Sequence, residues 1–353
     1  MKTIVLTGGG TAGHVTPNIA MIPTLEKEGW DIRYIGSHEG IEKNLIEDEG
    51  IPYYGISSGK LRRYIDLKNI TDPFKVVKGL LDAFILLKKL KPNVVFSKGG
   101  YVSVPVVIAA KMRGIPVVIH ESDITPGLAN KIAFPFAKKI CVNFPETLDH
   151  VKDKGVITGT PIREDLFKGD AKQGKKICDF KDDKPAITIM GGSQGSVRIN
   201  NIVREILNDL LPSYNIIHIC GKGNLDKELE GLQGYKQFEY VGEELPHIFA
   251  ITSLMLSRAG ANAIAEITAL KIPALLVPLS LEASRGDQIL NAKSMEKQGL
   301  CMVMEEEDMN QGSLQQAIDK LHKQREEFIK QMNKNKTSSG IELVLHEIRK
   351  CNS

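Results

Sequence analysis

Three stretches of this chain combine glycine with serine, threonine, histidine or alanine. These residue types are common where a protein binds phosphates or activates hydroxyl groups. The three stretches are "LTGGGTAGHVTP" (6–17), "MGGSQGSVRIN" (190–200) and "SRAGANAIAEITAL" (257–270). Each follows an apolar, β-branched run and opens a helical pattern. Such a strand–turn–helix unit leaves backbone N–H groups at the helix start, where the positive end of the helix dipole attracts an anionic ligand.

The first stretch fits the dinucleotide fingerprint G-x-G-x-x-G with its glycines at 8, 10 and 13. A nicotinamide site also needs an acidic residue at the end of the second strand, to hold the ribose. Here "DIRYIGS" (31–37) ends in glycine and serine, and Asp31 stands at its other end. The nicotinamide interpretation is therefore disfavoured. Two interpretations remain: a turn with a purely structural role, and a backbone surface that binds an anionic or sugar ligand.

His14 directly follows the last glycine of this turn. An imidazole at that position acts as a base near neutral pH, or it caps and packs the helix start.

The second half of the chain carries the other two turns. In 190–200, glycines allow close backbone approach while Ser193 and Gln194 add side-chain donors. In 257–270, small residues after Gly260 leave the helix N-terminus bare, which suits a diphosphate. Glu266 follows about two turns later, where a carboxylate accepts hydrogen bonds from ribose hydroxyls. Ordinary turn chemistry and tight helix packing are the structural alternatives.

Two further polar positions lie beside these turns, although solvation is their default role. Gln288 stands in the segment 278–299 after an apolar run, and Arg163 in "TGTPIRED" is suited to clamp a phosphate. The sequence contains no Asp-x-Asp, no histidine–carboxylate cluster with metal-ligand spacing and no P-loop. We therefore expect neither a metal nor a cofactor.

Short β-branched runs alternate with helical patterns through both halves of the chain, which predicts parallel sheets. The expected strands are 3–7, 31–36, 93–100, 116–122, 186–192, 215–221, 253–258 and 273–278. The pattern restarts after about residue 160, so we predict an α/β protein with two Rossmann-like parallel-sheet domains facing a cleft, 1–162 and 163–337. The polar segment 168–184 is expected to be a connector. An amphipathic helix at 340–350 closes either domain.

Composition and charge narrow the class further. The chain has 353 residues, 42% hydrophobic and 25% charged, with a net charge of only +3, which gives no argument for nucleic acid. Its five cysteines have no C-x-x-C spacing, which favours a reducing compartment. No apolar run reaches the roughly 18–20 residues of a membrane-spanning helix, so any membrane contact is expected to be peripheral.

One segment is locally basic, because residues 60–91 hold nine Lys or Arg and three Asp. Its apolar side chains form a broad helical face that either packs on a sheet or meets anionic lipid. The residues predicted to contact the membrane are Phe74, Lys75, Lys78, Leu81 and Lys88.

Seven motifs taken together resemble the MurG family of peptidoglycan N-acetylglucosaminyltransferases. In order they are "TGGGTAGHVTP", "FSKGGYVSVPVVIAA", "HESDITPGLANKIA", "TGTPIR", "GGSQGS", "SRAGANAIAE" and "DQILNA". The resemblance runs from residue 3 to about 300, and "SSGKLRRY" (57–64) resembles the Firmicute branch. It implies a glycosyltransferase B-type fold whose C-terminal helix, about 338–353, packs back on the first domain.

The same resemblance implies a reaction and its residues. N-acetylglucosamine would pass, with inversion, from UDP-N-acetylglucosamine to the C4 hydroxyl of lipid I at the cytoplasmic face of the cell membrane, with other cell-wall or division proteins as further partners. His14 would be the general base and Glu121 an acceptor-side catalytic residue. The substrate-binding residues would be Thr11, Ala12, Gly13, Asn130, Arg163, Ser193, Gly260, Ala261, Asn262, Ala263, Ile264, Glu266 and Gln288.

The chain departs from the family pattern in "HESD", where Ser122 and Asp123 stand in place of the Gln-Asn of many members. Two other functions fit the same two-domain architecture. One is a UDP-N-acetylglucosamine 2-epimerase, which handles no lipid, and the other is a non-catalytic nucleotide-sugar-binding protein.

Overall fold

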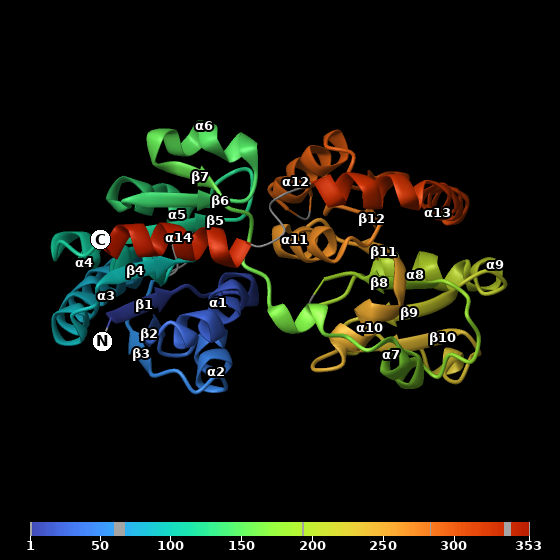
Figure 1. Ribbon diagram of the computed structural model, residues 1–353, viewed down its shortest axis with the longest axis horizontal. Helices are drawn as coiled ribbons and strands as arrows, with labels where there is room; N and C mark the ends of the chain where they lie inside the picture. Colours follow the sequence, from blue (N-terminus) through green and yellow to red (C-terminus); the bar gives the residue numbers. More distant parts are fainter. Residues whose placement is uncertain (1, 60–67, 193, 283, 335–339, 353) are drawn as a thin grey trace. The chain divides into compact units, whose positions relative to one another are not determined.

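The computed structural model describes residues 2–59, 68–192, 194–282, 284–334 and 340–352 of the chain. These residues form two compact units (Figure 1). Unit 1 comprises Met1–Arg163 and Ser339–Ser353, and unit 2 comprises Glu164–Ser338. Unit 1 is therefore built from two separate segments of the chain, and each unit is described by itself.

Unit 1 contains a seven-stranded sheet in the order β3-β2-β1-β4-β5-β6-β7, with every neighbouring pair parallel. The strands are β1 (Lys2–Thr7), β2 (Trp30–Ser37), β3 (Tyr53–Ile56), β4 (Val94–Ser97), β5 (Val117–Glu121), β6 (Lys139–Val142) and β7 (Gly155–Ile157). The helices are α1 (Thr16–Lys27), α2 (Ile41–Glu47), α3 (Lys68–Leu90), α4 (Ser103–Met112), α5 (Leu128–Ala133), α6 (Leu148–Val151) and α14 (Gly340–Asn352).

Helices cover both faces of this sheet, which is why its strands are apolar on both sides. Ile4 and Leu6 of β1 pack with α1 and α14 on one face, whereas Val5 packs with α3 and α4 on the other. The alternation follows from the two-residue period of a strand. Helix α14 crosses β4, β5 and β6 and buries Leu345 completely (Figure 1).

Unit 2 contains a six-stranded parallel sheet in the order β10-β9-β8-β11-β12-β13. The strands are β8 (Ala186–Met190), β9 (Asn215–Ile219), β10 (Tyr235–Phe238), β11 (Thr252–Ser257), β12 (Ala274–Leu276) and β13 (Met302–Val303). The helices are α7 (Ala171–Cys178), α8 (Val197–Glu205), α9 (Leu207–Leu210), α10 (Leu245–Ile251), α11 (Ala261–Leu270), α12 (Asp287–Lys297) and α13 (Gln311–Lys334). Helices α8 and α13 pack on one face, and α7 and α10 on the other.

All eight strands predicted from the sequence are present, and the predicted connector 168–184 is wrong in one respect. It contains the helix α7, which begins with Asp170 as its N-cap. Cys178 of α7 is buried with Ile248 of α10 in a small hydrophobic cluster. The segment has few apolar side chains, so its composition resembles that of a loop although it forms a helix.

Candidate active site

Both sheets have the strand order of a doubly wound fold, in which ligands bind outside the carboxyl ends of the strands where the order reverses. In unit 1 the reversal lies between β1 and β4, and in unit 2 between β8 and β11. The three glycine-containing stretches that stood out in the sequence follow β1, β8 and β11. A fourth turn, "SKGGY" (97–101), follows β4.

The turns after β1 and β4 touch each other through their backbones. Gly100 has a φ of +86°, and a Cβ on it would collide with the carbonyl of Gly9. Only glycine permits this approach. This contact fixes the backbone of the glycine turn that precedes His14.

His14 ends the short 3-10 helix Ala12–His14, and its Nδ1 lies 3.1 Å from the hydroxyl of Thr11. Burial, followed by the charge of Lys98, lowers the pKa of His14 to about 4, although a hydrogen bond to the backbone of Gly9 and the charge of Glu42 oppose the shift. The imidazole is therefore neutral at pH 7. A neutral imidazole is able to take a proton from a hydroxyl group.

Lys98 directly follows β4, and its side chain is only 2% exposed. Its ammonium donates a hydrogen bond to the hydroxyl of Ser122. Burial lowers its pKa to about 8, while Glu121 and Asp123 oppose that shift. The two residues that depart from the family pattern, Ser122 and Asp123, thus both act on this buried cation, together with Glu121.

Glu121 ends β5 and holds the loop that follows it. One carboxylate oxygen accepts from the N–H of Asp123 at 3.1 Å, and the other accepts from Gly127 N at 3.1 Å and from Asn130 Nδ2 at 2.9 Å. Burial raises the pKa of Glu121. These contacts support a positioning role for Glu121 and Asn130.

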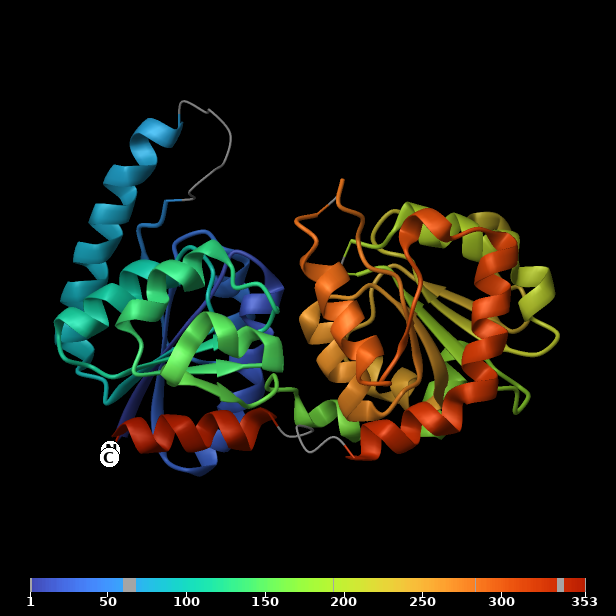
Figure 2. The same ribbon diagram turned by 90° about the horizontal axis from the view of Figure 1, so that it is seen from above.

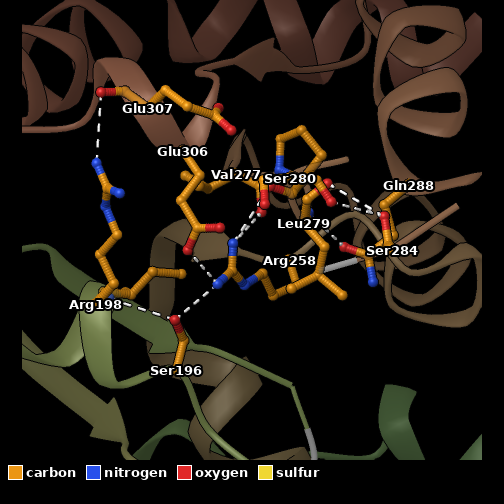
Figure 3. Close-up of polar contacts among 12 residues, drawn as sticks. Ser196, Arg198, Arg258, Val277, Leu279, Ser280, Ser284, Gln288, Glu306 and Glu307 are labelled. Carbon is orange, nitrogen blue, oxygen red and sulfur yellow. Dashed lines mark hydrogen bonds and ion pairs between the residues drawn. The ribbon is translucent and has the colours of Figure 1, made fainter. Parts of the chain in front are cut away.

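In unit 2, one arginine joins four loops at the carboxyl edge of the sheet (Figure 3). Arg258 follows β11, and its Nη2 donates to the hydroxyl of Ser196 at 2.8 Å and to Glu306 at 2.5 Å. Its Nη1 lies 3.3 Å from the carbonyl oxygens of both Val277 and Pro278. The side chain is buried, so the guanidinium holds these loops together.

Helix α11 begins at Gly260, where a Cβ would meet no atom within 4 Å. The space beside this N-cap residue is therefore free of protein atoms. Ala261 and Ile264 face the core, while Asn262 and Glu266 lie half-buried one turn apart on the other side.

Gln288 lies in the first turn of α12 and accepts a hydrogen bond from Leu279 N at 3.1 Å. Its side chain thereby holds the loop after β12 (Figure 3).

The structure brings Thr11, Ala12 and Gly13 into the same turn as His14, and it places Ala263 within the first turn of α11. Ser193 lies outside the described residues. Arg163 is the last residue of the first segment of unit 1 and is half-buried.

Sequence reasoning missed roles for three buried charged groups, Lys98, Glu42 and the Arg258–Glu306 pair. For Lys98 and Arg258 the available signal was a basic residue at the carboxyl end of an apolar strand pattern. No local pattern marks Glu42.

Helix α3 presents two different faces. Ala83 and Leu87 are buried against the sheet, whereas Val77, Leu81 and Ile85 are 59%, 58% and 65% exposed. The exposed side chains lie four residues apart and so form one stripe.

Basic side chains flank this stripe, since Lys75, Lys78 and Lys88 are also exposed. Figure 2 shows α3 with its N-terminal end projecting beyond the sheet of unit 1. The neighbouring Phe84 does not join the exposed stripe, because its ring is partly buried and lies under the guanidinium of Arg113 at 4.8 Å. The side chain of Phe74 lies outside the described residues.

Within the described ranges, no helix is long and apolar enough to span a membrane. The same residues contain no group of three His, Cys, Asp or Glu side chains placed to hold a metal ion.

Residues 4–142 match the glycosyltransferase family 28 N-terminal domain, and residues 186–348 match the C-terminal domain of that family. The chain belongs to glycosyltransferase family 28. A family 28 relative from Clostridium tetani is 58% identical over 350 residues, which cover 99% of this chain and 98% of the relative. It is named UDP-N-acetylglucosamine–N-acetylmuramyl-(pentapeptide) pyrophosphoryl-undecaprenol N-acetylglucosamine transferase, as is a relative from Clostridium perfringens that is 58% identical over 348 residues, 98% of each chain.

Solved structures agree on the fold. The crystal structure of Acinetobacter baumannii MurG has a TM-score of 0.78 and 27% identity, covering 99% of this chain and 100% of that one. A UDP-GlcNAc 2-epimerase from Methanocaldococcus jannaschii has a TM-score of 0.69 at 16% identity, with 99% of this chain and 100% of that one covered. The second likeness concerns the fold alone. The predicted glycosyltransferase B-type fold, with one parallel sheet in each half, is confirmed.

Proposed function

We propose that this protein transfers N-acetylglucosamine from UDP-N-acetylglucosamine to the C4 hydroxyl of the N-acetylmuramyl group of lipid I, which gives lipid II for peptidoglycan synthesis. The substrates are proposed from the names of relatives that match this chain over nearly its full length. The structural observation that carries the proposal is the neutral His14 after the glycine turn at the strand-order reversal of unit 1.

The proposed chemistry is one inverting displacement. His14 takes the proton of the C4 hydroxyl while that oxygen forms a bond to the anomeric carbon of N-acetylglucosamine. The bond from that carbon to the diphosphate breaks, and UDP leaves with the electron pair. Thr11 orients the imidazole, and Lys98 helps to keep it unprotonated.

The donor site is proposed at the strand-order reversal of unit 2. The first turn of α11, after its N-cap Gly260, offers backbone N–H groups and a positive dipole end to the leaving diphosphate, and residues 260–264 are the proposed donor contacts. Glu266 is assigned to the ribose hydroxyls, and Ser193 and Arg163 to the nucleotide sugar. Gln288 acts beside them by holding the loop after β12. Helix dipole and backbone donors take the role that a metal ion has in other diphosphate sites, so no metal is invoked.

The exposed stripe of α3, defined by Val77, Leu81 and Ile85, is the proposed membrane contact. Its flanking lysines meet anionic headgroups while the apolar side chains enter the interface. We therefore propose that the protein binds peripherally to the cytoplasmic face of the membrane, where it would meet an undecaprenyl-linked acceptor.

The experiment is a transfer assay with radiolabelled UDP-N-acetylglucosamine and a short-chain lipid I analogue, with and without EDTA. We expect label in the lipid product, one UDP released per transfer, and no loss in EDTA. His14→Ala should lower kcat by roughly 10²- to 10⁴-fold while KM for the donor stays within about twofold. Glu266→Ala should weaken donor binding.

Other outcomes contradict the proposal. Label in N-acetylmannosamine would identify a 2-epimerase, and donor binding without turnover would identify a nucleotide-sugar-binding protein. Full activity of His14→Ala would remove His14 as the base.

A further inference from the structure

Glu42 is a completely buried carboxylate in unit 1 that the transfer mechanism does not yet use. It is the second residue of α2, the helix that follows β2. Burying a carboxylate is costly unless several donors satisfy it, so its surroundings should consist of donors.

Three donors from two different segments converge on this carboxylate. Oε1 accepts from both the N–H and the hydroxyl of Ser37, at 3.0 and 2.5 Å. Oε2 accepts from the N–H of Gly10, at 3.2 Å. Glu42 thus connects the end of β2 to the glycine turn after β1. Charge-assisted bonds of this kind are about twice as strong as neutral ones.

Glycines surround the carboxylate so closely that no side chain fits between them and it. A Cβ on Gly9 would lie 2.5 Å from the Glu42 carboxyl carbon, and one on Gly36 would lie 2.9 Å from its Cγ. A Cβ on Gly40 would also collide with the carboxylate. The turn residues 8–10 are therefore shaped around Glu42 as well as around a ligand.

Neutral hydrogen bonds hold the two ends of the same turn. The hydroxyl of Tyr34 donates to Gly8 O at 2.8 Å, and Asn18 Nδ2 donates to His14 O at 3.4 Å. Glu42 holds the middle of the turn through Gly10, which lies four residues before His14.

We propose that Glu42 is a positioning residue of the transfer reaction, which fixes the glycine turn in the shape that presents His14 to the acceptor hydroxyl. This role rests on the proposed function. The negative charge of Glu42 also acts on His14 directly, since it raises the pKa of the imidazole while Lys98 lowers it.

The sharpest test is Glu42→Gln, because it keeps the shape and changes only the donor pattern. A carboxylate accepts at both oxygens, whereas a glutamine amide turns an NH₂ group toward one of the converging donors. We expect amides of residues 8–14 to exchange with solvent about 10- to 100-fold faster. In the transfer assay kcat should fall about 10- to 100-fold, with KM for UDP-N-acetylglucosamine within about twofold.

Two further variants keep the test decisive. Glu47→Gln is the control, since Glu47 is exposed on the same helix. This variant should match the wild type in amide exchange and in kcat. Ser37→Ala removes one of the three donors and should speed the same amides by a smaller factor, about 3- to 10-fold. It decides the matter if Glu42→Gln does not fold. In the double variant the two effects should be less than additive, because both act through one hydrogen bond.

Unchanged exchange of residues 8–14 in folded Glu42→Gln, or in Ser37→Ala if the former is unfolded, overturns the proposal. So does faster exchange with wild-type kcat. If the wild type itself transfers no sugar, the proposed function fails, while the exchange comparison still decides whether Glu42 holds the turn.

Discussion

At the scale of single residues, the base of the proposed reaction stands between two buried charges of opposite sign. Lys98 lowers the pKa of His14 and Glu42 raises it, while burial is the largest influence and lowers it. The result is an imidazole that stays neutral well below physiological pH. A base with such a low pKa is a weak proton acceptor, so its effect depends on orientation by Thr11 and by the turn.

Lys98→Met removes the cation while keeping a long side chain. The pKa of His14 should rise toward its usual value, since one of the two lowering influences is gone. A base works only when unprotonated, so kcat should begin to fall at a pH higher by roughly one unit. The expected loss relative to wild type is therefore small at pH 7.5 and larger at pH 5.5.

The measurement is kcat over that pH range, with Lys111→Met as a surface control from the same unit. If the pH at which kcat begins to fall on acidification were unchanged in Lys98→Met, or were lower, the electrostatic role of Lys98 would be contradicted.

At the scale of elements, the sequence predicted the strands at the centre of each sheet and missed β6 and the edge strands. Strand β1 was visible because Ile4, Val5 and Leu6 are buried on both faces and form an apolar run. Strands β3, β7 and β13 have two to four residues and lie at sheet edges, so no run of this kind marks them. The turns of the site were predictable because glycines punctuate a strand-to-helix change. The contacts that hold those turns come from distant segments, as Glu306 does for Arg258, and no local spacing reveals them.

Arg258 and Glu306 join the loops after β8, β11, β12 and β13 into one unit. Glu306→Ala leaves a buried guanidinium without its counter-charge, which costs about 3 kcal/mol. We expect the unfolding transition of unit 2 to fall by about 6–12 °C and KM for UDP-N-acetylglucosamine to rise. Calorimetry and donor titration measure these effects. Glu307→Ala, an exposed neighbour, should change neither, and equal behaviour of the two variants would contradict the role of the pair.

The exposed stripe of α3 gives a second prediction for an element. Leu81→Gln with Ile85→Gln removes two side chains that contact little within the protein. Binding to vesicles containing anionic phosphatidylglycerol should weaken by at least about tenfold, because the buried apolar area is lost, while the melting temperature should stay the same. Leu343→Gln on α14 is the control, since that leucine is also exposed but lies away from α3. Unaltered sedimentation of the double variant with vesicles would exclude this face as the membrane contact.

At the scale of the whole molecule, unit 1 depends on a helix encoded at the far end of the chain. Helix α14 buries Ile341, Val344, Leu345 and Ile348 in the same cluster as β1 and α1, and its Arg349 pairs with Glu28. The sequence predicted the amphipathic helix, but periodicity alone did not decide which half it covers. That choice depends on the apolar face left open on the sheet, which is a property of the folded unit.

Leu345→Ala tests this dependence because Leu345 is fully buried, whereas Leu343 on the same helix is 40% exposed. Removing the buried side chain should cost about 2–5 kcal/mol through lost transfer energy and a cavity. The loss should appear as earlier unfolding of residues 2–59 in hydrogen exchange, while UDP-N-acetylglucosamine binding by unit 2 is retained. Leu343→Ala should leave both unchanged, since most of its side chain already contacts water. If Leu345→Ala instead weakened donor binding and left the exchange of unit 1 unaltered, α14 would belong energetically to unit 2, and the two-segment construction of unit 1 would be wrong.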